Sequence, residues 1–427
     1  MKRLLRVSFD IFISSVTPIL TWFLLSITLD KKLINVFTLT YPLQCLSGIL
    51  TAIFGMGASI CIYKDNNKNS SNNGIFYGLL VSLVIFIYIL FNNDGYIKLM
   101  NMNANDYHIF SIYSIIQLFN QTIVMLILNK LYYMEENKKA NKISLLFNMS
   151  YFVITIVISL ITFNQFLVMI YTSIIMSLFT LIILITNIGK IDFKLNFYNA
   201  FKYNSVSIVK NILFFIIYLF GFKNSFAYGT KYIVAINLAT LVTDLQWDIE
   251  TSVSTVAKID ISKNKFVYKE HLKNALKLNV ILISSVIIMS LIGIFIYKPN
   301  MFIFLIFMTW HIIDYMLAPF TNIKISYLQL EYSSFKTTFN EMIAFAIRIF
   351  MSFIPTPFCT IIGQMCSSIY EFTYSTIKFG KIRIGINKEN YKKKNYLQFN
   401  LRVVFILSRE VRVLINYGAA CKNRTYS

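Results

Sequence analysis

Long apolar stretches separated by short polar segments run through most of the sequence, and they constrain its fold more than any other feature. A helix that crosses a bilayer needs about 20 predominantly apolar residues. Twelve such stretches cover residues 8–29, 35–62, 74–92, 107–129, 144–163, 165–188, 204–222, 229–257, 274–297, 300–322, 337–355 and 357–378. We therefore predict an all-α polytopic membrane protein with about twelve transmembrane helices.

The composition argues against the common classes of soluble protein. Only 14% of the 427 residues are charged and 56% are apolar, whereas a soluble domain has about 25% charged residues. These charges are too few to cover the surfaces of the domains that a soluble chain of this length would form. The sequence contains no phosphate-binding glycine loop, GxSxG motif or HExxH motif, and we expect no enzyme.

The basic residues are distributed unevenly along the chain. The net charge of +21 would suggest a nucleic-acid partner in a soluble protein. With the N-terminus inside, however, the inside segments and both termini together carry 32 Lys and Arg and the outside segments carry 6, with the Lys31–Lys32 pair as the clear exception. The positive-inside rule thus predicts a multi-pass protein of a bacterial-type plasma (inner) membrane, with both termini cytoplasmic and no nucleic-acid partner.

The two halves of the sequence show weak similarity at an offset near 195 residues. We predict a six-helix bundle in residues 1–190 and a second in 191–380, related as parallel repeats about an axis along the membrane normal. The Ile-, Asn- and Lys-rich composition could mimic part of this similarity. Residues 381–427 are predicted to form a basic cytoplasmic tail with an amphipathic helix on the anionic leaflet.

Acidic residues interrupt the eighth apolar stretch. A stripe with spacings of three or four residues contains Asn237, Thr240, Asp244, Asp248, Thr251 and Thr255, and Glu250 lies on an adjoining stripe. Carboxylates in hydrocarbon are costly, so this helix should face protein or a water-filled cavity. Either it contributes a cation, proton or cationic-substrate site, or it is an amphipathic helix at the cytoplasmic interface.

A second carboxylate, Asp314, lies within the tenth stretch. By helical spacing Trp310 lies on the same face of the helix as Asp314, and His311 directly follows Trp310 in the sequence. Pro319 follows and permits a kink. Asp314 is either a functional ion or substrate site or a structural partner of Arg348 in the next stretch.

Two further features concern conformational change and packing. Pro18 interrupts the first stretch, and we predict that it and Pro319 act in alternating access. In the second stretch Gly48, Ala52, Gly55 and Ser59 form a small-residue stripe that lets another helix approach, with Gln44 as a lumen contact at its edge. Lys210 is expected to extend from its stretch to the cytoplasmic interface.

Cysteine and histidine usage indicates no metal centre. The cysteines are Cys45, Cys61, Cys359, Cys366 and Cys421, and the three histidines are scattered. We expect reduced, buried thiols with no disulfide.

The sequence resembles the multidrug and toxic compound extrusion (MATE) transporters. The resemblance rests on Pro18 in the first stretch and on a second stretch that reads Tyr41-Pro42-Leu43-Gln44 and later Gly55-Met56-Gly57-Ala58-Ser59. It implies two six-helix bundles in a V, alternating access, and export of organic cations driven by Na⁺ or H⁺. Asp314 matches the acidic position of the family's second half. The acid expected after the first-half proline is absent until Asp30.

Together these observations predict a secondary active transporter, a Na⁺- or H⁺-coupled antiporter for organic cations, drugs or metabolites. The candidate ion and substrate residues are Asp314, Asp244, Asp248, Glu250, Gln44, Trp310, His311 and Arg348. We expect a monomer in the lipid bilayer with no cofactor besides the coupling ion. The alternatives are a flippase for a lipid-linked oligosaccharide, from the same superfamily, a membrane-embedded enzyme such as a glycan polymerase, and a transporter-like chain without activity.

Overall fold

The computed structural model describes residues 2–28, 35–100, 102–162, 164–263 and 267–390. The chain divides into two compact units, residues 1–376 and 377–427. Of the second unit the structure describes 377–390, which are helical. The Lys31–Lys32 pair, Asp30, Cys421 and the predicted amphipathic helix of the tail lie outside the described residues.

Twelve long helical segments make up the described chain, and each corresponds to one predicted apolar stretch. They are α1 (Lys2–Thr28), α2 (Val36–Leu50) continued by the π-helical η2 (Thr51–Gly57) and α3 (Ala58–Lys64), α4 (Ser70–Phe91), α6 (Ala104–Tyr133), α7 (Asn137–Thr162), α8 (Gln165–Asn187), α9 (Phe197–Phe226), α10 (Thr230–Ser262), α11 (Tyr268–Tyr297), α12 (Met301–Tyr327) continued by the π-helical η3 (Leu328–Tyr332), α13 (Ser334–Ser352) and α14 (Cys359–Asn390). A short helix, α5 (Asn93–Leu99), lies between α4 and α6. The all-helical fold that the apolar pattern predicts is confirmed.

The last helix is longer than expected. α14 continues to Asn390, beyond the predicted end at residue 378. The apolar pattern reports where a helix leaves hydrocarbon, whereas the helix ends where its backbone hydrogen bonds end, so a helix can extend well past its apolar stretch.

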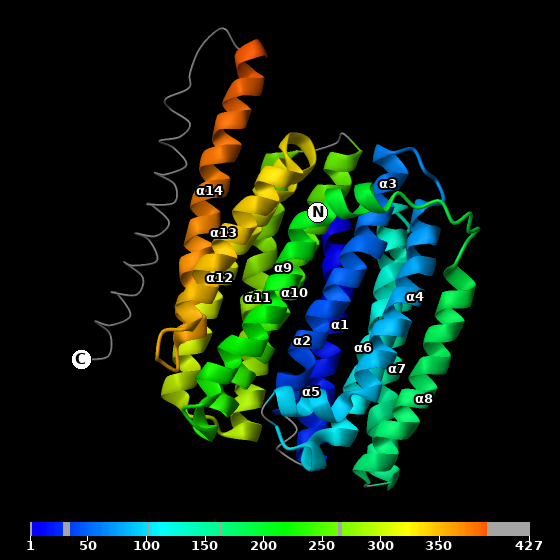
Figure 1. The fold of residues 1–427 in the computed structure, drawn as a ribbon, viewed down its shortest axis with the longest axis vertical. Coiled ribbons are helices and arrows are strands. Elements are labelled where there is room, and N and C mark those ends of the chain that lie inside the picture. The colour runs from blue at the N-terminus through cyan, green and yellow to red at the C-terminus, as the bar shows by residue number, and fades with distance from the viewer. Residues whose placement is uncertain (1, 29–34, 101, 163, 264–266, 391–427) are drawn as a thin grey trace. The chain divides into compact units, whose positions relative to one another are not determined.

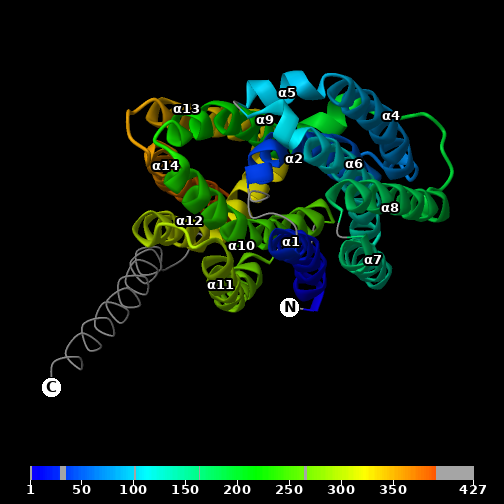
Figure 2. The ribbon, with the colours of Figure 1, turned by 90° about the horizontal axis from the view of Figure 1, so that it is seen from below.

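The packing of the first unit repeats between its two halves. α1 packs against α7 as α9 packs against α13, and α4 packs against α6 as α11 packs against α12. Between the halves, α2 contacts α9 and α1 contacts α10. Figures 1 and 2 show α4, α6, α7 and α8 on one side and α11, α12 and α13 on the other, with α1, α2, α9 and α10 between them. This arrangement agrees with the predicted parallel pseudo-repeat.

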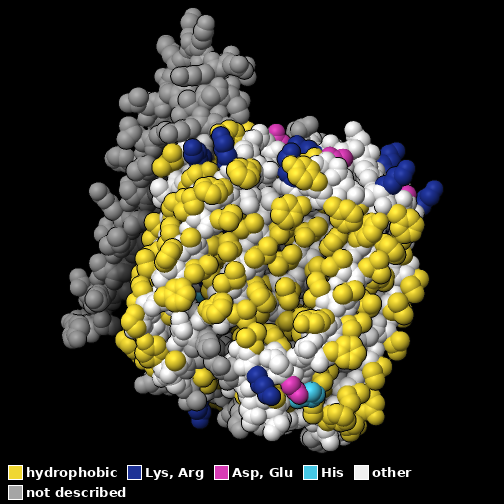
Figure 3. All heavy atoms as spheres, viewed as in Figure 1, with side chains coloured by type: hydrophobic (Ala, Val, Ile, Leu, Met, Phe, Trp, Pro, Cys, Tyr) yellow, Lys and Arg dark blue, Asp and Glu magenta, His cyan; other side chains and the backbone are white. Residues whose placement is uncertain are grey.

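The outer surface of the first unit is apolar, and small side chains fill the contacts between its helices. α4 buries Gly74 and Gly78 and exposes Leu80, Val84 and Tyr88. Figure 3 shows hydrophobic side chains across the middle of one face, with Lys and Arg mostly at one end. Large apolar side chains outside and glycine inside are typical of helices that pack in lipid.

Nine of the helical segments in the described chain are long and apolar enough to cross a membrane. The three long segments outside this set are α10, α13 and α14. All three carry charged side chains within their predicted membrane stretches. Because such side chains must be shielded from hydrocarbon, these helices are expected to line an internal polar site.

The extended segment 188–196 joins the halves, and asparagines near the start of α4 hold it. Asp192 accepts hydrogen bonds from Asn69 Nδ2 at 3.0 Å, from Asn73 Nδ2 at 2.5 Å and from the backbone N–H of Lys194 at 3.1 Å. The backbone N–H of Asp192 donates a hydrogen bond to Asn73 Oδ1 at 3.1 Å. These donors stabilise the carboxylate and lower the pKa of Asp192 to about 2.

We predict that Asp192→Ala loosens the segment 188–196 and speeds trypsin cleavage after Lys190 or Lys194. The reason is that the Asp192 carboxylate accepts three of the hydrogen bonds that hold this segment. The depressed pKa means that the stabilising contact is fully present above pH 3.8 and is lost as the pH falls through about 2. The ratio between the cleavage rates of Asp192→Ala and the parent protein should therefore be the same at pH 6 and pH 9. Asp94→Ala, in an exposed pair with His108, is the control, and equal cleavage of both variants would contradict the prediction.

We also predict that Gly74→Ala destabilises the protein by about 1–3 kcal/mol through overpacking. A Cβ at this position would overlap the carbonyl oxygen of Phe54 in η2. The measurement is thermal unfolding in detergent. Gly95→Ala is the matched control, since nothing lies within 4 Å of a Cβ there, and its unfolding temperature should not fall.

Candidate functional site

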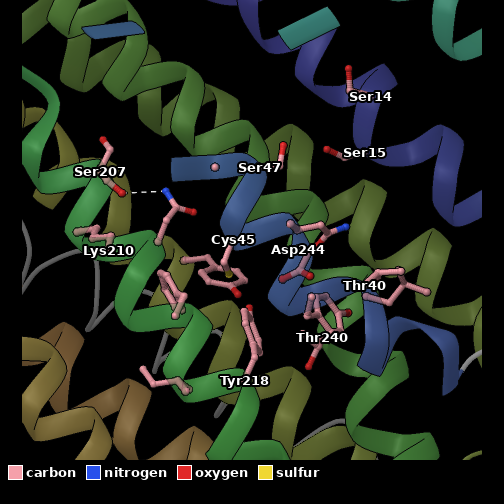
Figure 4. A pocket seen from close by; sticks show the side chains of 18 of the residues that line it. Ser14, Ser15, Thr40, Cys45, Ser47, Ser207, Lys210, Tyr218, Thr240 and Asp244 are labelled. Atoms are coloured by element: carbon pink, nitrogen blue, oxygen red, sulfur yellow. Dashed lines mark hydrogen bonds between the residues drawn. The ribbon is translucent and has the colours of Figure 1, made fainter. Parts of the chain in front are cut away.

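A cavity of about 520 Å³ lies between the two halves. Its first-half wall, from α1, α2, η2, α6 and α7, is neutral and includes Ser14, Ser15, Gln44, Ser47, Gln117, Gln121 and Asn148. Its charged lining residues, Lys210, Asp244, Lys258, Asp314, Arg348 and Glu371, all come from the second half. Figure 4 shows Ser14 and Ser15 of α1 and Ser207 and Lys210 of α9 on opposite sides of α2, which carries Cys45 and Ser47. The charged groups are therefore segregated on one wall.

Asp314 lies in this wall with its carboxylate buried. Gln364 of α14 donates a hydrogen bond from its Nε2 to Asp314 Oδ2. The Oε1 atom of the same glutamine accepts a long hydrogen bond, 3.4 Å, from Arg348. The structure therefore places a neutral amide between Asp314 and Arg348. One of the two expectations from the sequence was a direct ion pair between these residues. Arg348 also lies over the ring of Phe214, 4.8 Å from its centroid.

Lys210 joins two carboxylates from different helices. Its Nζ lies 3.2 Å from Glu341 Oε2 of α13 and 3.2 Å from Glu371 Oε2 of α14. The side chain of Glu341 is fully buried and that of Glu371 is 14% exposed. The prediction that Lys210 extends to the interface is wrong, because two buried carboxylates supply its counter-charge inside the protein.

Lys258 of α10 binds α9 within the second half, at the residue through which α9 contacts an irregular part of the first half. Its Nζ donates to Asn204 Oδ1 at 2.6 Å and to Ser207 Oγ at 3.0 Å, both neutral. Asn204, where α9 departs from helical geometry, donates its Nδ2 to the carbonyl of Ala52 at 3.0 Å. Ala52 lies in η2, and π-helical segments are frequent at functional sites. The positive-charge pattern had assigned Lys258 to a cytoplasmic segment, whereas it is buried and lines the cavity.

The polar stripe of α10 turns toward the cavity where the structure describes it. Thr240, Asp244 and Thr255 line the cavity, and Asn237 is buried. This favours the cavity interpretation over an amphipathic surface helix. The side chains of Asp248 and Glu250 lie outside the described residues. Gln44 of α2 also lines the cavity.

The aromatic neighbours of Asp314 separate onto different faces of α12. His311 is buried, lines the cavity and stacks on Tyr315 with ring centroids 5.7 Å apart. Trp310 is 42% exposed on the outer surface and does not contribute to the cavity lining. Four helical residues rotate the side chain about 40° beyond one full turn. At the edge of a buried face this rotation is enough to separate Trp310 from Asp314.

The two prolines lie inside long helices, and their role in alternating access stays a prediction. Pro18 is inside α1 and lines the cavity, and Pro319 is buried inside α12. In the second stretch, a Cβ at Gly48 would overlap the side chain of Asn211, and one at Gly55 would lie 2.7 Å from Asn129 Nδ2. The small-residue stripe therefore does allow neighbouring helices to approach closely.

The sequence reasoning missed the charged residues Lys258, Glu341 and Glu371, and it also missed Gln364, which connects Asp314 to Arg348. The two glutamates stand within the eleventh and twelfth apolar stretches, so a search of every stretch for carboxylates would have found them. Gln364 carries no charge and repeats no pattern. Only the tertiary contacts reveal its position between Asp314 and Arg348.

Among the described residues no group of three or more His, Cys, Asp or Glu could hold a metal ion. Cys45, Cys61 and Cys359 are buried free thiols, and Cys366 is half-buried.

Two ion pairs join the halves at the end of the molecule where most Lys and Arg side chains lie (Figure 3), called here the lysine-rich end. Lys64 of α3 pairs with Glu331 of η3 at 3.0 Å, and Lys263, after α10, pairs with Glu135, after α6, at 2.7 Å. These pairs occupy equivalent positions in the two repeats. Asp65 adds hydrogen bonds from Tyr203 Oη at 2.7 Å and from Asn199 Nδ2 at 3.0 Å.

We predict that Lys64→Glu opens this end. A surface ion pair contributes about 0.2–1 kcal/mol, so the ratio of open to closed molecules should rise about 1.4- to fivefold. Electron–electron distances between spin labels at positions 68 and 335, in a cysteine-free background, measure this ratio. Lys64→Glu with Glu331→Lys should restore the closed distance. Lys139→Glu, which disrupts a pair within one half, should leave it unchanged.

The sequence matches no protein-family model and no curated protein, but solved structures share its fold. A MOP-superfamily transporter from Pyrococcus furiosus, described as having a reversed binding-pocket polarity, superposes with a TM-score of 0.65 at 15% identity. The outward-facing and inward-facing forms of a multidrug resistance MATE transporter give TM-scores of 0.63 and 0.57, at 13% and 15% identity. Each match covers 90% of this chain and 96% of the other. The chain therefore has the fold of the MATE transporters of the MOP superfamily, as its second apolar stretch led us to expect.

Proposed function

We propose that the protein is a secondary active transporter that exports a small organic cation by alternating access, in exchange for H⁺ or Na⁺. The observation that carries this proposal is the buried carboxylate of Asp314 in the wall of a cavity between two pseudo-symmetric halves. An intramembrane carboxylate is costly unless it has a function or a partner. Its described hydrogen-bond partners, Gln364 and Ser368, are both neutral.

The cavity has the size and chemistry of a site for an amphiphilic molecule. Its volume of about 520 Å³ lies within the range of drug-sized pockets. Its aromatic lining consists of Trp22, Tyr41, Tyr113, Phe147, Tyr151, Phe214, Tyr218, Phe307, Tyr315 and Phe345. Aromatic faces attract organic cations, and nearby carboxylates add a counter-charge.

The arrangement of the halves suits alternating access. The contacts of α2 with α9 and of α1 with α10 form the joint on which the halves could rock. The reciprocal ion pairs lie at the lysine-rich end, so they would hold that end closed in this conformation. Both outward-facing and inward-facing forms are known for the multidrug transporter of the same fold.

In this mechanism the chain's own residues hold ion and substrate in turn. Asp314 accepts either a coupling ion or the cationic group of the substrate, and the two compete for the same carboxylate. Asp244, in the same wall of the cavity, is a second carboxylate available to this competition. The lysine-rich end is the cytoplasmic side by the positive-inside rule, so the substrate leaves from the other side.

A second candidate function is a flippase for a lipid-linked oligosaccharide. The observation that favours it is Lys258, a buried base in the cavity with neutral partners, which together with Arg348 could attract a pyrophosphate. Organic-cation export remains the preferred function, because the same cavity lining contains the carboxylates of Asp244, Asp314 and Glu371 and many aromatic rings.

We predict that Asp314→Asn strongly slows ion-driven efflux of a fluorescent aromatic cation from proteoliposomes in which H⁺ and Na⁺ gradients are imposed separately. Loss of a charged contact worth roughly 1.5–3 kcal/mol should reduce the rate about tenfold or more. The amide keeps the shape of the side chain, so the variant should remain folded.

Asp94→Asn, in an exposed pair outside the cavity, is the matched control and should transport like the parent. Gradient-driven efflux that is unchanged by Asp314→Asn would refute the assignment of this residue. Absence of cation efflux in the parent, together with transfer of a fluorescent lipid-linked sugar, would favour the flippase.

A further inference from the structure

The bridge from Asp314 through Gln364 to Arg348 joins three helices by one side chain. Gln364 reaches from α14 to α12 with its amide nitrogen and to α13 with its amide oxygen. The glutamine is 4% exposed. A Cβ at the neighbouring Gly363 would lie 2.8 Å from the carbonyl oxygen of Arg348, so α13 and α14 approach closely at this level. The amide therefore occupies a defined place between the two charges.

A direct contact between these charges would have a different electrostatic consequence. An arginine in contact with an aspartate strongly favours the ionised carboxylate. The attraction decreases in inverse proportion to distance, so an amide inserted between the two groups reduces it to roughly half. A carboxylate in a tight ion pair exchanges its counter-ion poorly, whereas one that accepts a neutral N–H can gain and lose a proton or Na⁺.

Arg348 is not otherwise anchored by a carboxylate contact that the structure describes. Its guanidinium has a 3.4 Å hydrogen bond to Gln364 on one side and the ring of Phe214 on the other. Its Nε has no hydrogen-bond partner among the described residues. Without the glutamine, the guanidinium would be free to move onto Asp314.

We propose that Gln364 is a positioning residue that keeps Arg348 away from Asp314, so that this carboxylate can exchange its coupling ion. This inference rests on the proposed function. It adds that the ion affinity of the site is set by an uncharged side chain on a third helix, which acts through Asp314.

Other charged or titratable groups around the carboxylate come from each neighbouring helix. They are His311 and Tyr315 of α12, Arg348 of α13, Glu371 of α14 and Asp244 of α10, which faces Tyr315. Glu371 is held by Lys210. Variants at Gln364 leave all these groups in place, so a change in ion dependence would report the bridge.

The test is the pH dependence of cation efflux in proteoliposomes, with three substitutions whose expected shifts differ in direction. Gln364→Ser removes the bridge and lets Arg348 reach Asp314, so the midpoint should move about 1 pH unit or more toward acid. Gln364→Glu places a second carboxylate beside Asp314, and Arg348→Gln removes the positive charge. Both should move the midpoint toward alkaline pH. If the coupling ion is Na⁺, the same variants should lower, raise and raise the apparent Na⁺ affinity.

The double variant Gln364→Ser with Arg348→Gln isolates the proposed cause. The acid shift of Gln364→Ser should vanish in this background, because the arginine that produces it is absent. Gln165→Ser, outside the cavity, is the matched control for the substitution. Size-exclusion profiles in detergent monitor folding, and Gln364→Glu and Arg348→Gln retain side chains of similar size if Gln364→Ser does not fold.

An unchanged midpoint in the Gln364 variants, or a uniform loss of rate without a shift, would overturn the proposal. A shift of the same sign in Gln364→Ser and Gln364→Glu would also overturn it. These outcomes are distinct from failure of the proposed function, which Asp314→Asn tests directly. If that variant loses coupling while the Gln364 variants keep the parent midpoint, only the role of Gln364 is refuted.

Discussion

The cost of placing a charge in hydrocarbon organises this structure. Inside a bilayer no water is available to solvate a lysine or carboxylate, so such groups require protein partners or an internal cavity. Six charged side chains, from α9, α10, α12, α13 and α14, lie together in one wall of the cavity, whereas the middle of the outer surface is mostly apolar (Figure 3). α10, α13 and α14, the long helices outside the set of nine apolar candidates, all line this cavity. Their polarity follows from their internal position.

The two halves share an architecture but differ in chemistry. The helix contacts repeat from one half to the other, and so do the reciprocal ion pairs at the lysine-rich end. The cavity lining does not repeat, since its charged residues all belong to the second half. A symmetric frame with an asymmetric site allows the halves to rock while ion and substrate remain near one wall.

Much of the fold could be predicted from the sequence, because an apolar stretch of about 20 residues has few alternatives to a membrane helix. The twelve helices, the cavity position of Asp244 and the close packing at Gly48 and Gly55 agree with predictions from composition and spacing. Side-chain direction was less predictable. Trp310 and Asp314 share a face by spacing, yet only Asp314 lies at the cavity.

The sequence by itself determined the number of helices, the segregation of basic residues and the resemblance to a transporter fold. These properties depend on the composition of short stretches of sequence, where the pattern of apolar and charged residues indicates the local structure. The tertiary structure decided which charges meet. It placed Gln364 between Asp314 and Arg348, joined Lys210 to Glu341 and Glu371, and buried Lys258 beside Asn204. These contacts join helices that are far apart in the chain, and no local pattern specifies how two helices face each other.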